Sequence, residues 1–291
     1  MTPYKKRWGD RFDARWVREL DSLHAFMPYI FPNRTDNEAF LSVSVDLTHL
    51  NGYLKMKNES NPESRYSTFQ ALIAALVRTM TLRPMMNRFI KGCRIYHRDK
   101  LTFAFVVKKK FADDAHEALA FIEFGEDDTI DTVHNRLMQE INECRSEKPD
   151  NSTAAMDFLT KFPRPVLRFI MFILNTLEFY GRAPYDLIKT DPNHASIFLT
   201  NLGSIGLKAG YHHLTNWGTN SVFIVLGEKT MRPHCDEAGN MTMREYMDLG
   251  ITLDERIADG YYYSGTVKLL EHLLSHPELL DQRAKEPVNY E

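Results

Sequence analysis

The stretch ITLDERIADGYYYSG, residues 251–265, begins as an apolar run and ends as the start of an amphipathic helix. Three charged residues in succession, Asp254, Glu255 and Arg256, close the apolar run. Charges at such a point either solvate the end of a strand or place a catalytic base where a strand meets a helix. The stretch alone leaves both interpretations open.

A second apolar run, IFLTNLGSIG at residues 197–206, ends in a turn that contains Gly203 and Gly206. Glycine lets the backbone turn sharply and lets a ligand approach closely. Thr200 and Asn201 stand just before this turn, and the Thr200 hydroxyl is suited to donate a hydrogen bond to a bound oxyanion. The glycine spacing is not G-x-G-x-x-G, so nothing supports a dinucleotide-binding fold.

Hydrophobic periodicity predicts strands interleaved with helices along the chain. Strands are expected over residues 39–48, 101–107, 195–203, 220–228 and a run ending near 255, with a turn at 237–240. Helices are expected from a capping box at Ser67 and Gln70 to Pro84, and over 130–141, 163–180 and 261–275. The polar stretch SEKPDNST joins two halves of what we predict to be one α/β domain on a mixed sheet.

Composition excludes several classes of protein. Apolar residues make up 43% and charged residues 26% of the 291, and the net charge of −3 argues against nucleic acid as a partner. The three cysteines show no metal-ligand spacing, which predicts no metal and suits a reducing cytoplasm. No signal peptide is visible, and the apolar run 166–177 is too short to span a bilayer. We expect a cytoplasmic protein without a transmembrane segment.

The two stretches together resemble the catalytic domains of 2-oxo acid dehydrogenase acyltransferases. IFLTNLGSIG is similar to the F-T-I-S-N-L-G strand of that family, and LDERIADG to its Y-D-H-R-V-x-D-G strand end. The order of these two motifs and the spacing between them agree with those of the family, and the resemblance extends from about residue 12 to residue 281. It implies the chloramphenicol acetyltransferase-like fold, a single α/β domain with a mixed sheet flanked by helices. An N-terminal arm, 1–35, would pack on the acyltransferase-like core, 36–291.

The resemblance also implies a function. Members form trimers with an active site at each subunit interface, where coenzyme A and an acyl acceptor enter from opposite ends of a channel. A thiol or hydroxyl of a small-molecule acceptor attacks the acyl-CoA thioester. Thr200 matches the hydroxyl residue that binds the tetrahedral oxyanion, and Asn201 and Gly203 belong to the same motif.

Asp259 and Gly260 match the last two residues of the family's strand-end motif. In the family this aspartate forms a buried pair with an arginine from the N-terminal region. Arg18 and Arg34 are both candidates for that partner, because the N-terminal part of the chain matches poorly.

The sequence departs from the family at the catalytic base, since Glu255 stands where the motif has histidine. A glutamate carboxyl ordinarily titrates about 2 pH units below a histidine, so it takes a proton from a thiol less readily. A dry pocket, for instance against Tyr261 to Tyr263, would narrow this difference.

Three hypotheses follow from this departure. Glu255 is the base of a modified acyltransferase, or the chain is a catalytically degenerate homologue that acts as a binding or assembly subunit. In the third hypothesis another histidine is the base, and His212 and His213 in GYHHLTNWG are the candidates.

The helix expected over 163–180 is a second departure, because the family is usually shorter there. We interpret it as an inserted core or interface helix; a wall for a long acyl chain or a peripheral membrane contact are less favoured alternatives. Lipoyl-bearing and subunit-binding segments do not precede the core in this sequence. We therefore expect an acceptor taken from solution or from another protein.

Overall fold

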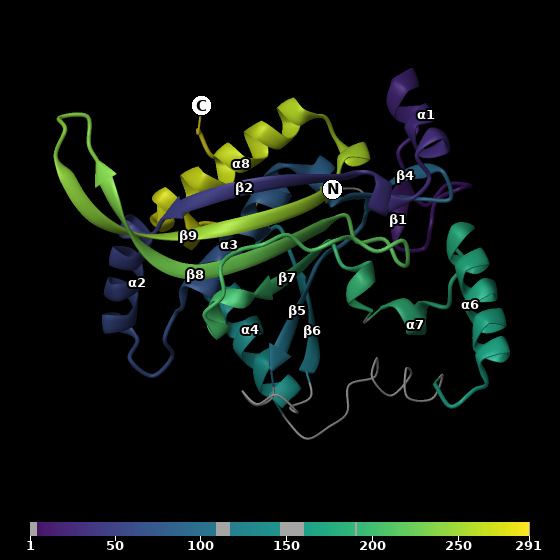
Figure 1. The fold of residues 1–291 in the computed structure, drawn as a ribbon, viewed down its shortest axis with the longest axis horizontal. Coiled ribbons are helices and arrows are strands. Elements are labelled where there is room, and N and C mark those ends of the chain that lie inside the picture. Colours follow the sequence, from purple (N-terminus) through teal and green to yellow (C-terminus); the bar gives the residue numbers. More distant parts are fainter. Residues whose placement is uncertain (1–4, 109–116, 146–159, 190, 291) are drawn as a thin grey trace.

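The structure, a computed structural model, describes residues 5–108, 117–145, 160–189 and 191–290. Its main feature is a six-stranded sheet with the order β2-β9-β8-β7-β5-β6 (Figure 1). The strands are β2 (Glu38–Asp46), β5 (Leu101–Lys108), β6 (Glu117–Phe124), β7 (Ile197–Asn201), β8 (Val222–Cys235) and β9 (Met241–Asp254). β5, β7 and β8 run parallel, whereas the other pairs are antiparallel. The mixed sheet predicted from the sequence is therefore confirmed.

Four helices pack against one face of this sheet and bury the main core. They are α2 (Thr48–Ser60), α3 (Thr68–Leu82), α4 (Ile130–Arg145) and α8 (Gly260–Ser275). The capping box predicted at the start of α3 is present, with Ser67 and Gln70 each bonded to the other's backbone. Alternate residues of the central strands, such as Ile224 and Ile251, point into this core.

In the part of the chain that the structure describes, the opposite face of the sheet is covered by a loop and not by helices. After β7 the chain forms the short 3-10 helix η4 (Leu202–Ile205), and residues 206–214 then cross β8 and β9. A Cβ at Gly227 would lie 2.4 Å from the Ala209 nitrogen, and one at Gly250 would lie 1.9 Å from the Gly210 carbonyl oxygen. Glycine is required where the loop passes this close to the strands. We call this side the loop-covered face.

A separate three-stranded sheet, β1-β4-β3, was not predicted. It consists of β1 (Ala14–Trp16), β3 (Arg88–Lys91) and β4 (Arg94–Arg98), and Phe89 and Tyr96 stack in its small core. Helix α1 (Ser22–Ile30) and the 3-10 helix η1 (Arg34–Asp36) connect β1 to β2. The chain before residue 38 thus contributes a strand and a helix of its own.

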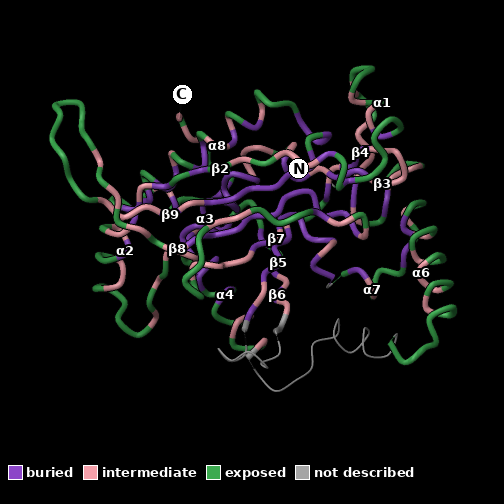
Figure 2. The backbone as a smooth tube through the Cα atoms, viewed as in Figure 1, coloured by how far each residue is buried: buried purple, intermediate pink, exposed green. Residues whose placement is uncertain are grey.

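Two further helices precede β7. α6 (Arg164–Phe179) is the helix predicted over 163–180, and α7 (Tyr185–Ile188) follows it, with the 3-10 helix η3 (Pro192–His194) leading into the sheet. α6 stands at one end of the molecule, away from the main sheet, and is largely exposed (Figures 1 and 2). The SEKPDNST stretch lies outside the described residues. In the part of the chain that the structure describes, every helix is too short or too polar to cross a membrane.

Candidate functional site

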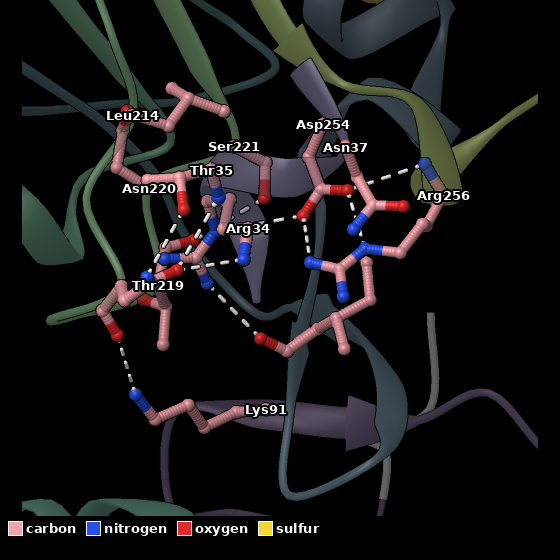
Figure 3. A network of polar contacts seen from close by, with 12 residues as sticks. Arg34, Thr35, Asn37, Lys91, Leu214, Thr219, Asn220, Ser221, Asp254 and Arg256 are labelled. Carbon is pink, nitrogen blue, oxygen red and sulfur yellow. Dashed lines mark hydrogen bonds and ion pairs between the residues drawn. The ribbon is translucent and has the colours of Figure 1, made fainter. Parts of the chain in front are cut away.

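The end of β9 carries a buried ion pair. Asp254 is completely inaccessible, and its carboxylate accepts hydrogen bonds from Arg256 Nε at 2.8 Å and Arg256 Nη2 at 2.7 Å. Arg256 is 1% exposed, and its Nη1 donates to the Phe31 carbonyl at 2.6 Å. This two-pronged geometry fixes the turn that the short 3-10 helix η5 (Glu255–Ile257) makes after the strand (Figure 3).

Arg34 completes this network from the N-terminal part of the chain. Its Nε lies 3.5 Å from the Asp254 carboxylate, and its other nitrogens donate to the carbonyls of Thr215 at 2.6 Å and Ile90 at 3.1 Å (Figure 3). Burial lowers the pKa of Arg34 to about 10 despite the neighbouring Asp254. One guanidinium therefore ties η1, β3, the loop before β8 and the end of β9 together.

The pairing expected for Asp259 is wrong in one respect. Arg34, and not Arg18, reaches this region, but the carboxylate that it meets is Asp254. Arg18 is bound instead to Asp10 and to two backbone carbonyls near the N-terminus. Asp259 is exposed, and its carboxylate accepts from the Tyr262 nitrogen at 2.7 Å, so that it caps α8, which begins at Gly260. A carboxylate at that position stabilises the helix start without an arginine.

Glu255 stands between these buried groups but points to solvent. Its backbone nitrogen donates to the Asn37 carbonyl at 2.9 Å, whereas its side chain makes no hydrogen bond or ion pair with any residue that the structure describes. Arg256 is paired with Asp254 and does not form an ion pair with Glu255. The pocket suggested by the three tyrosines is absent from the described chain: Tyr261 is 89% exposed, and the Tyr263 hydroxyl is used by backbone groups below the surface.

Thr200 lies at the carboxyl end of β7, where it is half-exposed on the loop-covered face. Asn201 follows and holds the turn, because its side-chain oxygen accepts from the Ser204 nitrogen at 3.1 Å. A Cβ at Gly203 would come within 2.4 Å of the Gly227 carbonyl oxygen. The motif thus places the Thr200 hydroxyl at an accessible position beside a fixed turn.

The sheet keeps Thr200 and Glu255 apart within one chain. Thr200 pairs with Val225, and Val225 pairs with Gly250, four residues before the end of β9 at Asp254. This register separates Thr200 from the end of β9 at Asp254 by about 14 Å along the strands and about 10 Å across them, and Glu255 lies one residue further on. A single protomer therefore does not bring Glu255 and Thr200 to the same reacting atom.

His212 lies closer to Thr200 than Glu255 does along the same face. Its ring stacks on Phe223 with centroids 4.2 Å apart, and Phe223 is two residues from Val225, the strand partner of Thr200. His212 Nδ1 is 2.8 Å from the His213 carbonyl, which only accepts, so Nδ1 carries the proton and Nε2 is left as a base. His213 stacks on His212, and both side chains are exposed.

Sequence reasoning missed the buried roles of Asp254 and Arg256, which resemble a solvated strand end when taken as adjacent charges. Their two-residue spacing does place both side chains on one side of an extended chain, and this was the available signal. Within the described residues, histidine, cysteine and acidic side chains do not gather in groups of three or more that would hold a metal ion.

The chain matches no known protein-family profile and no curated protein sequence. Its structure, however, is similar to that of a probable dihydrolipoamide acetyltransferase from Listeria monocytogenes 4b F2365, with a TM-score of 0.58 and 13% identity over 94% of this chain and 98% of that one. A chloramphenicol acetyltransferase matches with a TM-score of 0.55 and 14% identity over 90% and 99% of the two chains.

A third similar structure was determined to investigate a serine, a histidine and an asparagine in the catalytic mechanism of Azotobacter vinelandii dihydrolipoamide acetyltransferase. It matches with a TM-score of 0.53 and 14% identity over 96% of this chain and 99% of that one. The chain therefore has the chloramphenicol acetyltransferase-like fold, which is also that of the 2-oxo acid dehydrogenase acyltransferases, as predicted. At these identities the similarity establishes the fold alone.

Proposed function

We propose that the protein is a coenzyme A-dependent acyltransferase whose active sites form between the subunits of a homotrimer. Glu255 of one subunit acts as the base, and Thr200 of the next binds the oxyanion. The separation of these two accessible residues within one chain is the observation that carries the proposal. Thr200 lies in β7 beside a well-fixed turn and Glu255 lies on one, and neither side chain has a hydrogen-bonding partner among the described residues.

The similar acyltransferases support this assignment. In the Azotobacter enzyme the histidine and asparagine that were investigated stand four positions apart, as Glu255 and Asp259 do. That spacing puts one residue at the base position and the other at the start of the following helix. A cytoplasmic location suits the three cysteines, which are free thiols.

In the proposed reaction the acyl group moves from the thioester of acyl-CoA to the acceptor. A thiol acceptor gives a new thioester, and a hydroxyl acceptor gives an ester. Glu255 takes the proton of the acceptor's thiol or hydroxyl as its sulfur or oxygen bonds to the acyl carbon of acyl-CoA. The carbonyl oxygen becomes an oxyanion and accepts a hydrogen bond from the Thr200 hydroxyl. The C–S bond to coenzyme A then breaks, and the leaving thiolate takes the proton back from Glu255.

The neighbouring subunit has a second role in this proposal. Glu255 is exposed in the single chain, and a carboxylate base needs dry surroundings to accept a proton from a thiol. Contact with the next subunit would exclude water from Glu255 and so supply these dry surroundings. Because Arg256 is paired with Asp254, it is not a partner of Glu255.

A second arrangement is favoured by the geometry of His212. Its Nε2 is available as a base and its ring lies on the face that carries Thr200, so both groups would come from one chain. In this arrangement Glu255 is not part of the chemistry. A third candidate, a degenerate homologue that acts as a binding or assembly subunit, is favoured by the exposure of Glu255 in the protomer.

The test measures thiol release from acetyl-CoA and longer acyl-CoAs with thiol and hydroxyl acceptors. The variants are Glu255→Gln, Glu255→His, His212→Asn and Thr200→Val, and light scattering reports the oligomer. The exposed turn variant Glu237→Gln is the matched control. Loss of two or more decades of kcat in Glu255→Gln, with acyl-CoA binding kept, supports glutamate as the base.

Other outcomes separate the candidates. A loss of kcat of the same size in His212→Asn, together with normal activity of Glu255→Gln, assigns the base to His212. Turnover in Glu255→His alone identifies a degenerate homologue. The proposed function is overturned if light scattering shows a monomer and neither the wild type nor any variant binds acyl-CoA.

A further inference from the structure

Helix α6 is apolar on two opposite sides. Its sequence is RPVLRFIMFILNTLEF, and Glu178 is its one buried residue. An inner side, which includes Ile170 and Leu174, is half-covered by the body of the protein. The outer side is covered by none of the residues that the structure describes (Figure 2).

The outer side is a continuous apolar surface. Val166, Phe169 and Ile173 recur at spacings of three and four residues, which places them on one side of the helix, and Phe172, three residues after Phe169, borders them. Phe169 is 63% exposed and Phe172 is 67% exposed. Soluble proteins rarely expose adjacent large apolar side chains in this way unless the surface binds something.

The charged side chains exposed on α6 itself, Arg164 and Arg168, are both cations. Lys161, Arg164, Arg168 and Arg182 are exposed and have no ion pair with the part of the chain that the structure describes. The one carboxylate of the helix, Glu178, is turned inward, where Arg11 and His194 approach it at 3.2 and 3.4 Å. Among the described residues of α6, the charges exposed beside the apolar surface are therefore positive.

The helix is held firmly at its C-terminal end. Besides the contacts of Glu178, the Phe179 carbonyl lies so close to the turn between β3 and β4 that a Cβ at Gly92 would be 2.2 Å from its oxygen. The rest of α6 extends along the end of the molecule (Figure 1). Its outer side is thus presented outward in a fixed orientation.

We propose that α6 lies on an anionic lipid surface. Its aromatic and aliphatic side chains enter the boundary between headgroups and acyl chains, and its four cations contact the lipid phosphates and carboxylates. An in-plane helix with large apolar residues on one side and only basic charges beside them fits this environment. A second copy of the chain carries a net charge of only −3, whereas an anionic lipid surface presents many negative charges, so charge complementarity favours lipid.

Helix α1 offers a matched control within the same molecule. It also exposes large apolar side chains, among them Phe26 at 60% and Tyr29 at 62%. Its sequence SLHAFMPYI contains no lysine or arginine, and Asp21 caps its start. Apolar exposure without adjacent positive charge is not expected to bind anionic lipid.

The experiment is flotation of the full chain with vesicles of phosphatidylcholine, alone or with phosphatidylserine added. The wild type is expected to float with the anionic vesicles and to be released by high salt. Phe169→Ser/Phe172→Ser should abolish binding, and Arg164→Gln/Arg168→Gln should weaken it about thirtyfold. Phe26→Ser/Tyr29→Ser should bind as the wild type does. Urea midpoints equal to the wild type's show that each variant is folded.

Two results overturn the proposal. One is wild-type protein that stays with the unbound fraction for both kinds of vesicle, or that binds both equally. The other is a change of oligomeric state in Phe169→Ser/Phe172→Ser without any vesicle binding by the wild type, which assigns the surface to a second copy. Flotation does not depend on turnover, so its outcome is independent of the acyltransferase assay.

Discussion

Asp254 and Arg256 form a two-pronged ion pair, with bonds of 2.8 and 2.7 Å, in a place that water does not reach. The two residues stand on either side of Glu255 and are joined by Arg34 from the other end of the sequence. Because Asp254 and Arg256 are fixed in the interior, the Glu255 side chain between them is directed to solvent. The first two predictions concern the residues that fix this turn.

Replacing Asp254 with asparagine should reduce the free energy of unfolding by about 3–5 kcal/mol, because it leaves two buried guanidinium groups with no carboxylate. Urea unfolding measures the effect, with Glu237→Gln as an exposed control. The double variant Asp254→Asn/Arg256→Gln should recover part of the loss. A single variant as stable as the control would show that the network carries no net stability.

Replacing Asp259 with alanine should cost about 0.5–2 kcal/mol of unfolding free energy, since the cap of α8 is lost. Asparagine at this position keeps an oxygen that accepts from the Tyr262 nitrogen, and the variant should be nearly as stable as the wild type. Thermal or urea unfolding distinguishes the two variants. A loss of several kcal/mol in Asp259→Asn would instead indicate the buried arginine pair that the family resemblance implied.

Gly250 of the loop-covered face and Gly52 of α2 should respond oppositely to substitution by alanine. Gly250→Ala should destabilise the fold by about 2 kcal/mol or more, because its Cβ would collide with the Gly210 carbonyl. Gly52→Ala, in the exposed middle of α2 with no neighbouring atoms, should stabilise it by about 0.5–1 kcal/mol. Equal effects of the two substitutions on the urea midpoint would contradict the crossing of the loop over β9.

The pH dependence of stability should carry a contribution from His194. Burial alone would lower the pKa of His194, but Asp191 at 3.0 Å and Glu178 at 3.4 Å outweigh it and raise the pKa. The stabilisation is then complete below the ordinary value of about 6.5 and is lost as the pH rises through the raised value. Urea midpoints across this range should fall with pH in the wild type.

The same measurement on His194→Gln should show a smaller fall, whereas His49→Gln, which alters an exposed histidine, should follow the wild type. The carboxylates act in the opposite direction: the pKa of Glu178 is lowered by its cationic neighbours despite burial, so its contribution is lost as the medium becomes acidic. An unchanged slope in His194→Gln would contradict the assignment.

The sequence predicted the parts of the fold that depend on local apolar pattern. β7 begins with three apolar residues and β9 ends in the mostly apolar run LGITL before Asp254, whereas α3 has both a helical period and a capping box. β3 and β4 were missed because they are short, with the sequences RFIK and RIYHR, in which polar or charged residues flank only two adjacent apolar residues. Arg98, for example, is buried with its guanidinium 4.4 Å from the centre of the Phe89 ring, a contact that only the folded chain creates.

The candidate site was predicted in part for the same reason. Thr200, Asn201 and Gly203 act through a local turn, which the motif specifies. The buried state of Asp254 depends on Arg34, which is distant in the sequence, so the residues around the strand end could not reveal it. The exposure of Glu255 follows from that distant contact as well.

The pairing of β2 has a consequence for the order in which the protein is made. β2 is an edge strand whose one neighbour in the main sheet is β9, and Glu38 is opposite Asp254 in that pairing. During synthesis β2 leaves the ribosome early and has no strand to join until nearly the whole chain has followed it. The long-range pairing makes closure of the sheet a late event. Chains that end before β9 expose an unpaired strand to one another, and a cell must protect them until translation is finished.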